Sequence, residues 1–117
     1  MITKSTMPEM WRDLMDIQTI RAEEHPYCCV CGKSGHVAPL NRHHIVPRSA
    51  GNLIANGHSR RKPTVPLCGR GNATGCHGMA HSGRLHFRNH DGELEYLVCE
   101  PCDRLTALSM DGWRHVR

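Results

Sequence analysis

The sequence predicts a small α+β domain, and its length, its hydrophobic periodicity and its cysteines support this class. The chain has 117 residues and no internal repeat, which is the size of one domain. An apolar pattern with helical spacing comes first, and shorter stretches with the alternation typical of strands follow. We therefore expect one domain over residues 1–117, with an N-terminal helix at 1–25, a metal-binding core at 27–83 and a hairpin with a C-terminal extension at 84–117.

The supply of core-forming side chains is small. Leu, Ile, Val and Phe together number 21 of 117 residues, close to the composition of disordered chains. Zinc bound to thiolates supplies folding free energy directly, and the chain has seven cysteines. The chain shows neither a signal-peptide pattern nor a membrane span, so we expect a cytoplasmic, reducing setting in which paired cysteines bind metal.

Charge is sorted along the chain. No Asp or Glu occurs between His25 and His90, whereas nine cations do: Lys33, Arg42, Arg48, Arg60, Arg61, Lys62, Arg70, Arg84 and Arg88. This asymmetry predicts a polyanionic partner, and the phosphate backbone of DNA fits best. The cations expected to contact DNA are Arg42, Arg48, Arg60, Arg61, Lys62, Arg70 and Arg84.

The N-terminal stretch reads as an amphipathic helix. Thr6 is the expected N-cap, Pro8 stands in the first turn and Glu9 completes a capping box. Apolar residues then recur at helical spacing, namely Met7, Met10, Trp11, Leu14, Ile17 and Ile20. We expect the helix to reach about residue 24, before Pro26, and to pack on the core.

The pattern Cys28-x2-Cys31-Gly32 has the form of a zinc knuckle. A gap of two residues lets both sulfur atoms face one ion, and Gly32 permits the tight turn. Cys29 points elsewhere in this arrangement, so we interpret it as a small buried residue or a spare thiol.

Two cysteine pairs are candidates for the other half of a four-cysteine zinc site. Cys99 and Cys102 have the better spacing, because they form a second knuckle. Cys68 and Cys76 have the better position, because zinc bound there would fix the strand end and the helix start that present His77. We favour Cys68 and Cys76, and the C-terminal pair stays as the alternative.

Four histidines occur at spacings that suit one metal site. His77 and His81 are four residues apart, so on a helix they lie on one face and share a cation. His43 and His44 are neighbours in a predicted strand, so their side chains point to opposite faces. One strand histidine added to the helix pair gives three nitrogen ligands with open positions, and the other is left as a neutral base.

The remaining elements follow from alternation and turn residues. We expect the following order: a strand at 42–48, a long loop at 49–63, a return strand at 64–68, a helix at 75–82, a β-hairpin at 85–98 and a closing helix at 103–110.

Taken together, the Cys28 knuckle, the His43-His44-Ile-Val-Pro doublet and Gly75-Cys76-His77-Gly78 with His81 resemble the HNH endonuclease family, including its small bacteriophage members. The resemblance covers roughly residues 27–83. It implies a ββα-metal (His-Me finger) core, with His43, His77 and His81 as ligands of a catalytic ion and His44 as the general base.

The resemblance also implies an activity. The enzyme would hydrolyse DNA phosphodiester bonds with one divalent ion (Mg²⁺, Mn²⁺, Ni²⁺, Co²⁺ or Zn²⁺), leaving 5′-phosphate and 3′-hydroxyl ends, while a structural Zn²⁺ holds the knuckle. Relatives of this kind imply a bacterial host cell and, as further partners, phage packaging proteins. One departure stands out: the family's middle Asn, which ties down the loop of the base, is replaced by Lys62-Pro63-Thr64, and Asn52, Asn56 and Asn72 are the nearby substitutes.

Two other functions compete with the nuclease. A non-catalytic zinc-ribbon DNA-binding module explains the charge and the cysteines but leaves the His43-His44 doublet without a purpose. A metal-storage or redox-sensing protein would use Cys29, Cys99 and Cys102. The isolated histidines receive no role in any of these hypotheses: His25, His36, His58, His86, His90 and His115.

Overall fold

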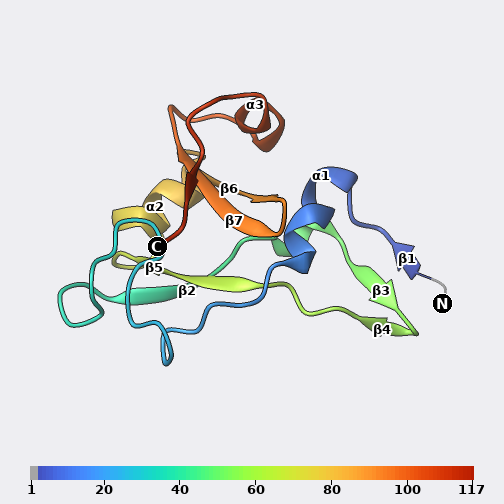
Figure 1. Ribbon diagram of the computed structural model, residues 1–117, viewed down its shortest axis with the longest axis horizontal. Coiled ribbons are helices and arrows are strands. Elements are labelled where there is room, and N and C mark those ends of the chain that lie inside the picture. The colour runs from blue at the N-terminus through green and yellow to red at the C-terminus, as the bar shows by residue number, and fades with distance from the viewer. Residues whose placement is uncertain (1–2) are drawn as a thin grey trace.

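Three small antiparallel sheets carry most of the regular structure in the computed structural model, which describes residues 3–117 (Figure 1). The first sheet has the order β1-β3-β4, the second β2-β5 and the third β6-β7-β8. The strands are β1 (Thr3–Ser5), β2 (Leu40–His44), β3 (Leu53–Ala55), β4 (His58–Ser59), β5 (Thr64–Cys68), β6 (Leu85–His90), β7 (Glu93–Val98) and β8 (Arg114–His115).

The helices of the described chain are short, with at most seven residues each. They are α1 (Glu9–Arg12), α2 (Gly75–His81) and α3 (Arg104–Leu108), with 3-10 turns η1 (Asp13–Asp16) and η2 (Arg48–Ala50). The result is a small compact α+β domain, as the sequence predicts. Among the residues that the structure describes, no helix has the length and hydropathy needed to span a bilayer.

Strand β5 is the centre of the fold. It pairs with β2 on one side, in a register that places His43 opposite Val65 and His44 opposite Thr64. Other segments cover its second edge, because Ile20 N donates to the carbonyl of Thr64 at 2.9 Å and Cys29 N donates to the carbonyl of Pro66 at 3.0 Å. All residues of β5 are therefore buried.

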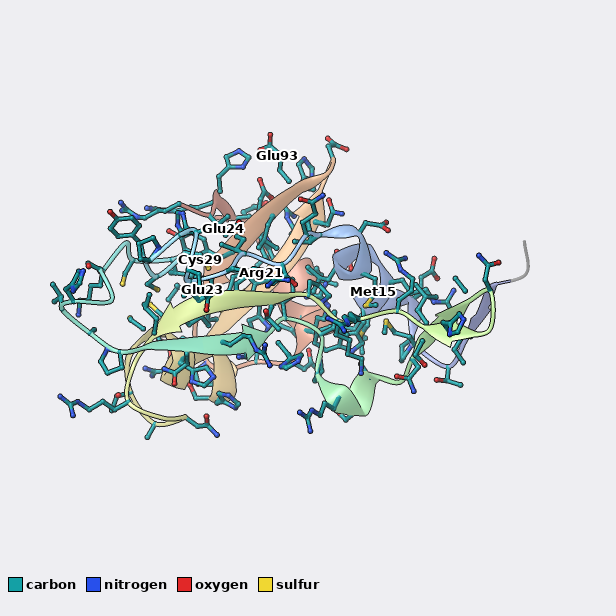
Figure 2. All side chains as sticks on the ribbon, turned by 90° about the horizontal axis from the view of Figure 1, so that it is seen from below. Met15, Arg21, Glu23, Glu24, Cys29 and Glu93 are labelled. Atoms are coloured by element: carbon teal, nitrogen blue, oxygen red, sulfur yellow. The ribbon has the colours of Figure 1, made fainter. Side chains whose placement is uncertain are left out.

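This second edge explains why the predicted N-terminal helix at 1–25 is wrong. The described helix ends at Arg12, and after η1 the chain is extended at Ile17. The segment then runs beside β5, where Thr64 N donates to the hydroxyl of Thr19, and Figure 2 shows Arg21, Glu23 and Glu24 farther along it. Backbone hydrogen bonds to β5 outweigh the helical periodicity of the apolar residues.

The predicted cap is also wrong. Pro8 is the N-cap residue of α1, and its side chain makes no capping bond. Thr6 instead pairs with Asn52: its hydroxyl accepts from Asn52 N at 3.0 Å, and its backbone N donates to the carbonyl of Asn52 at 3.0 Å. Thr6 thus extends the pairing of β1 with β3 toward the helix.

The boundaries of two other predictions need correction. The first predicted strand, at 42–48, runs instead from Leu40 to His44, and the 3-10 turn η2 follows it. The predicted loop at 49–63 holds β3 and β4, joined by a turn in which Asn56 and Gly57 have positive φ. This hairpin lies at one end of the long axis of the molecule (Figure 1).

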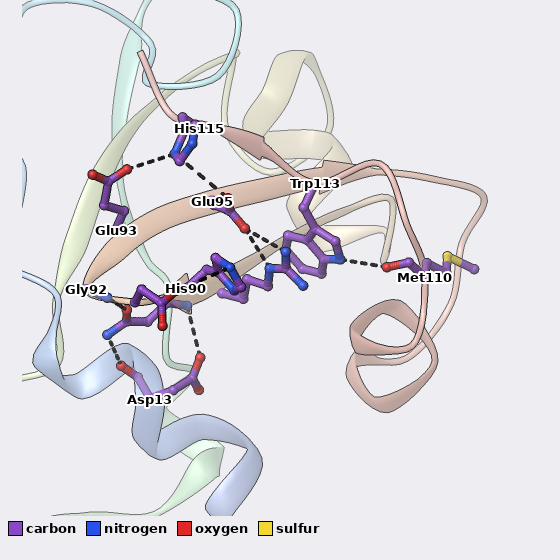
Figure 3. Close-up of polar contacts among 11 residues, drawn as sticks. Asp13, His90, Gly92, Glu93, Glu95, Met110, Trp113 and His115 are labelled. Atoms are coloured by element: carbon purple, nitrogen blue, oxygen red, sulfur yellow. Dashed lines mark hydrogen bonds and ion pairs between the residues drawn. The ribbon is translucent and has the colours of Figure 1, made fainter.

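The predicted hairpin is present as β6 and β7, with Asp91 and Gly92 in its turn. A polar network attaches it to its neighbours (Figure 3). Asn89 Nδ2 donates to the carbonyl of Asp13 at 2.9 Å, and Asn89 N donates to the Asp13 carboxylate at 3.0 Å. The ion pair of the buried Glu95 with Arg88, at 2.8 Å, joins the two strands of the hairpin itself. The hairpin therefore packs firmly against η1, above the β2–β5 pair.

Candidate functional site

Four cysteines converge at one end of the β2–β5 pair. The sulfur atoms of Cys28, Cys31, Cys68 and Cys76 all lie within 4.8 Å of one another, and those of Cys31 and Cys68 are 3.5 Å apart. In a tetrahedral zinc site with Zn–S bonds of about 2.3 Å, sulfur atoms stand roughly 3.8 Å apart. The structure therefore brings Cys68 and Cys76 to the knuckle, and Cys99 and Cys102 lie elsewhere.

Local backbone geometry places these sulfurs. In the knuckle, Gly32 N donates to the carbonyl of Cys28 at 3.0 Å, and Gly32 has a φ of +79°, which favours glycine. In the second half, Gly75 has a φ of +64°, and a Cβ there would lie 2.5 Å from the carbonyl oxygen of Cys68. Only glycine lets the chain turn closely enough for Cys68 and Cys76 to meet.

The chemistry of the four thiols fits a cation. Hydrogen bonding from Cys76 lowers the pKa of Cys28, and the same hydrogen bond raises the pKa of Cys76. Backbone N–H groups of Cys31, Cys68 and Val30 lower the pKa of Cys28 further. The cluster thus stabilises negative charge on sulfur, and a bound divalent ion would stabilise the remaining thiolates. The cluster is compatible with a structural zinc ion.

Cys29 lies outside this group. Its side chain is fully buried, and burial raises the pKa of its thiol. A thiolate is needed for reactivity, so the environment of Cys29 does not suit a redox sensor.

The second group consists of three histidines. His43 comes from β2, whereas His77 and His81 come from α2, and their ligand atoms lie within 4.8 Å of one another. The Nε2 atoms of His77 and His81 are 3.0 Å apart. Nitrogen ligands at about 2.0–2.1 Å from one ion stand roughly 3 Å apart, so this spacing fits a shared cation.

The orientation of His77 is set by the loop before α2. Its Nδ1–H donates to the carbonyl of Gly71 at 2.8 Å, which leaves the Nε2 lone pair directed at His81. A second hydrogen bond of this kind is the usual way in which proteins orient a metal-binding imidazole. Asn41 holds the start of the same loop, because its Nδ2 donates to the carbonyl of Gly69 at 2.7 Å.

Two of these imidazoles, those of His43 and His81, favour the neutral form that binds metal. Burial and, to a smaller extent, the charges of His77, His81 and His44 lower the pKa of His43 to about 4. Burial and the charge of His77 also lower the pKa of His81. Lone pairs are therefore available to a cation at neutral pH.

His44 is the neighbour of this group and opens onto a pocket of about 740 Å³. The residues that line this pocket include the three grouped histidines, Arg42, Arg48, Trp11 and Phe87. None of the lining residues in the described chain carries a carboxylate. Burial lowers the pKa of His44, and the charges of Arg48, Arg42 and Lys62 lower it further.

A second pocket, of about 760 Å³, adjoins the first across His44 and Arg42. Glu23 and Glu24 line it together with Arg61, so both signs of charge face its interior. An anion is therefore better accommodated in the pocket of His43 and His81 than here.

Lys62 holds the loop that follows His44. Its Nζ donates to the carbonyl of Pro47 at 3.0 Å and to that of Arg48 at 3.1 Å. The three asparagines considered as anchors behave differently, because none of their side chains forms a hydrogen bond with this loop within the part of the chain described: Asn52, Asn56 and Asn72. Sequence reasoning placed Lys62 among the phosphate contacts and missed this anchoring role.

The other cations expected to contact DNA are distributed over the surface. Arg60 is engaged elsewhere, because its Nη2 donates to the carbonyl of Met15 at 3.0 Å and its Nη1 lies 3.6 Å from Asp16. Arg70 is exposed in the loop before α2, and Arg84 lines a shallow pocket beside His81. The predicted DNA-contacting cations that line the two pockets beside His44 are thus Arg42, Arg48, Arg61 and Lys62.

A third group joins Cys99 and Cys102 to His86, to which the sequence assigned no role. Their ligand atoms also lie within 4.8 Å of one another. The hairpin register pairs His86 with Leu97, two residues before Cys99. The predicted hairpin therefore contained the information that His86 lies near Cys99, which the isolated position of His86 in the sequence did not.

Comparison of the chain with family models, curated proteins and solved structures found no match.

Proposed function

We propose that this protein is a metal-dependent DNA endonuclease of the HNH type. The observation that carries the proposal is the convergence of His43, His77 and His81 beside His44, on a pocket that presents Arg42 and Arg48. Strand β2, strand β5 and helix α2 supply the site in the order strand, strand, helix, which is the order of a ββα-metal core.

The three grouped imidazoles would hold the catalytic ion. They are neutral nitrogen ligands without a carboxylate nearby, a set that suits Ni²⁺, Zn²⁺, Co²⁺ or Mn²⁺ better than Mg²⁺. When bound, a divalent ion supplies Lewis-acid stabilisation of the charge that develops on phosphate oxygens. His77 remains oriented throughout by its bond to Gly71.

His44 has the role of general base in this proposal. It lies next to His43 in the strand, so its side chain is left outside the metal-binding group and faces the pocket. Burial and then the surrounding cations lower its pKa, which favours the neutral imidazole that can take a proton from the attacking water. Arg42 and Arg48 would bind the phosphates on either side of the scissile bond.

Cleavage of supercoiled plasmid tests the proposal. The wild-type protein should convert it to the nicked form with added Mg²⁺, Mn²⁺, Ni²⁺ or Co²⁺ and not with a chelator. A DNA ligase should reseal the nicks, because the proposed hydrolysis leaves 5′-phosphate and 3′-hydroxyl ends. If the protein binds DNA tightly but cleaves it with none of these metals, the result would instead support a zinc-ribbon binding module.

We further propose that Lys62 positions the loop of the base. Lys62→Met removes the ammonium group that holds the carbonyls of Pro47 and Arg48, so kcat should fall about ten- to a hundredfold as His44 loses its orientation. The KM for DNA should change less. Steady-state nicking assays separate these two constants.

Arg61→Met is the matched control for Lys62. It removes the neighbouring cation, which lines the adjoining pocket and makes no hydrogen bond or ion pair within the described chain. It should raise KM and leave kcat nearly unchanged. Equal effects of both variants on KM, with kcat unchanged in both, would show that Lys62 only attracts DNA.

A further inference from the structure

A second thiolate site adjoins the proposed nuclease centre, because its His86 also lines the pocket of His43 and His44 but belongs to a different group of metal-binding side chains. Cys99 Sγ is 3.6 Å from Cys102 Sγ, and Cys102 Sγ is 3.6 Å from His86 Nε2. For tetrahedral zinc with bonds of about 2.3 Å to sulfur and 2.0–2.1 Å to nitrogen, these separations are roughly 3.8 Å and 3.6 Å. The three donors therefore already stand at the spacing of zinc ligands.

The backbone fixes two of the donors before any ion binds. Cys102 N donates to the carbonyl of Gly83 at 3.1 Å, and Cys99 N donates to the carbonyl of Arg84 at 2.9 Å. These bonds clamp the turn between β7 and α3 onto the connection between α2 and β6. A preorganised set of donors loses little entropy when it binds an ion.

His86 can exchange its present partner for an ion. Its Nε2–H donates to the carbonyl of Gly83 at 2.8 Å, but the same carbonyl also accepts from Cys102 N. Giving up the bond from His86 leaves Gly83 still hydrogen-bonded, so its carbonyl is not orphaned. With its proton moved from Nε2 to Nδ1, the imidazole can then offer the Nε2 lone pair next to the two sulfur atoms.

We propose that His86, Cys99 and Cys102 bind a second zinc ion, with water in the fourth position. Two thiolates and one imidazole form a donor set that selects zinc over magnesium or calcium. All three residues are half-buried, so an ion reaches them from solvent. The open fourth position makes this ion more exchangeable than one held by the four-cysteine group.

The location gives the ion a structural consequence. Cys102 lies two residues before α3, whose first residue, Arg104, is buried. The guanidinium of Arg104 donates to the carbonyls of Met10 and Phe87 and pairs with Asp13 at 3.2 Å. Zinc at this site would therefore hold α3 where Arg104 joins the N-terminal segment to β6. This inference does not depend on the proposed nuclease activity.

Cobalt is a suitable probe, because Co²⁺ bound to thiolate gives a charge-transfer absorption that Co²⁺ bound to histidines alone does not give. The protein, kept reduced, is dialysed briefly against a chelator to clear exchangeable sites and is then titrated with Co²⁺. The wild type should develop the thiolate band. The double variant Cys99→Ser, Cys102→Ser should lose it, and His86→Ala should bind Co²⁺ at least tenfold more weakly.

Cys29→Ala is the control, because Cys29 is a thiol outside every cluster and its removal should leave the band unchanged. A wild type without the band would overturn the proposal, as would a double variant with a band equal to that of the wild type. The four-cysteine group also carries thiolates, so His86→Ala decides if the double variant fails to fold: Co²⁺ binding as tight as in the wild type would overturn the proposal.

Discussion

His44→Ala should reduce plasmid nicking about 10²- to 10⁴-fold in kcat, the usual contribution of a general base. The variant removes the imidazole that faces the pocket but leaves all three grouped histidines in place. Metal binding, measured by calorimetry, and DNA binding, measured by fluorescence anisotropy, should therefore stay close to the wild-type values. Single-turnover cleavage assays in the most effective metal measure the loss directly.

His58→Ala provides the matched control for this variant. His58 is an exposed histidine on β4 that lies outside every metal-binding group, so cleavage should be unchanged. Added imidazole should partly restore cleavage by His44→Ala, because a small base fits the pocket left behind. Cleavage by His44→Ala at the wild-type rate would show that the protein is a nuclease whose general base is not His44.

Cys68→Ser should abolish tight zinc binding and cooperative folding. Binding of structural zinc is worth about 10–16 kcal/mol at neutral pH, which is of the same size as the roughly 5–15 kcal/mol of net stability of an ordinary domain. The chain has a small apolar core, so the ion is a large part of what stabilises it. Circular dichroism on heating, with zinc content measured in parallel, should show a chain without a folding transition.

Cys29→Ala separates the loss of a metal ligand from the loss of a buried thiol. Cys29 is as fully buried as Cys28 but is outside the four-cysteine group, so its removal should cost about 0.5–3 kcal/mol and leave zinc content unchanged. A strong chelator should unfold the wild type as Cys68→Ser does. Thermal unfolding that is insensitive to the chelator would show that the four thiols hold the fold without an ion.

Patterns confined to a few residues could be predicted from the sequence. The i, i+4 spacing of His77 and His81 depends only on helix geometry, and the Cys28-x2-Cys31 turn depends only on local backbone conformation. The hairpin of β6 and β7 is likewise marked by alternation and by Asp91 and Gly92 in its turn. Each of these is a short-range property of the backbone, so reading it requires no knowledge of distant partners.

Choices between distant segments could not be read in this way. The N-terminal helix stops early because residues 19–20 hydrogen-bond to the edge of β5. The sequence around these residues does not indicate that this strand edge lies beside them. His86 acquires partners only through the hairpin register and the turn that follows β7.

By itself, the sequence determined which residues are chemically able to bind metal or an anion: the knuckle cysteines, the histidines at helical and strand spacing, and a central stretch of cations without acids. The tertiary structure decided which of them meet, placing Cys68 and Cys76 at the knuckle and Lys62 on the loop of His44. The physical reason is that local spacing follows from bond geometry, whereas partner choice depends on hydrogen bonds and burial that exist only once distant segments have come together.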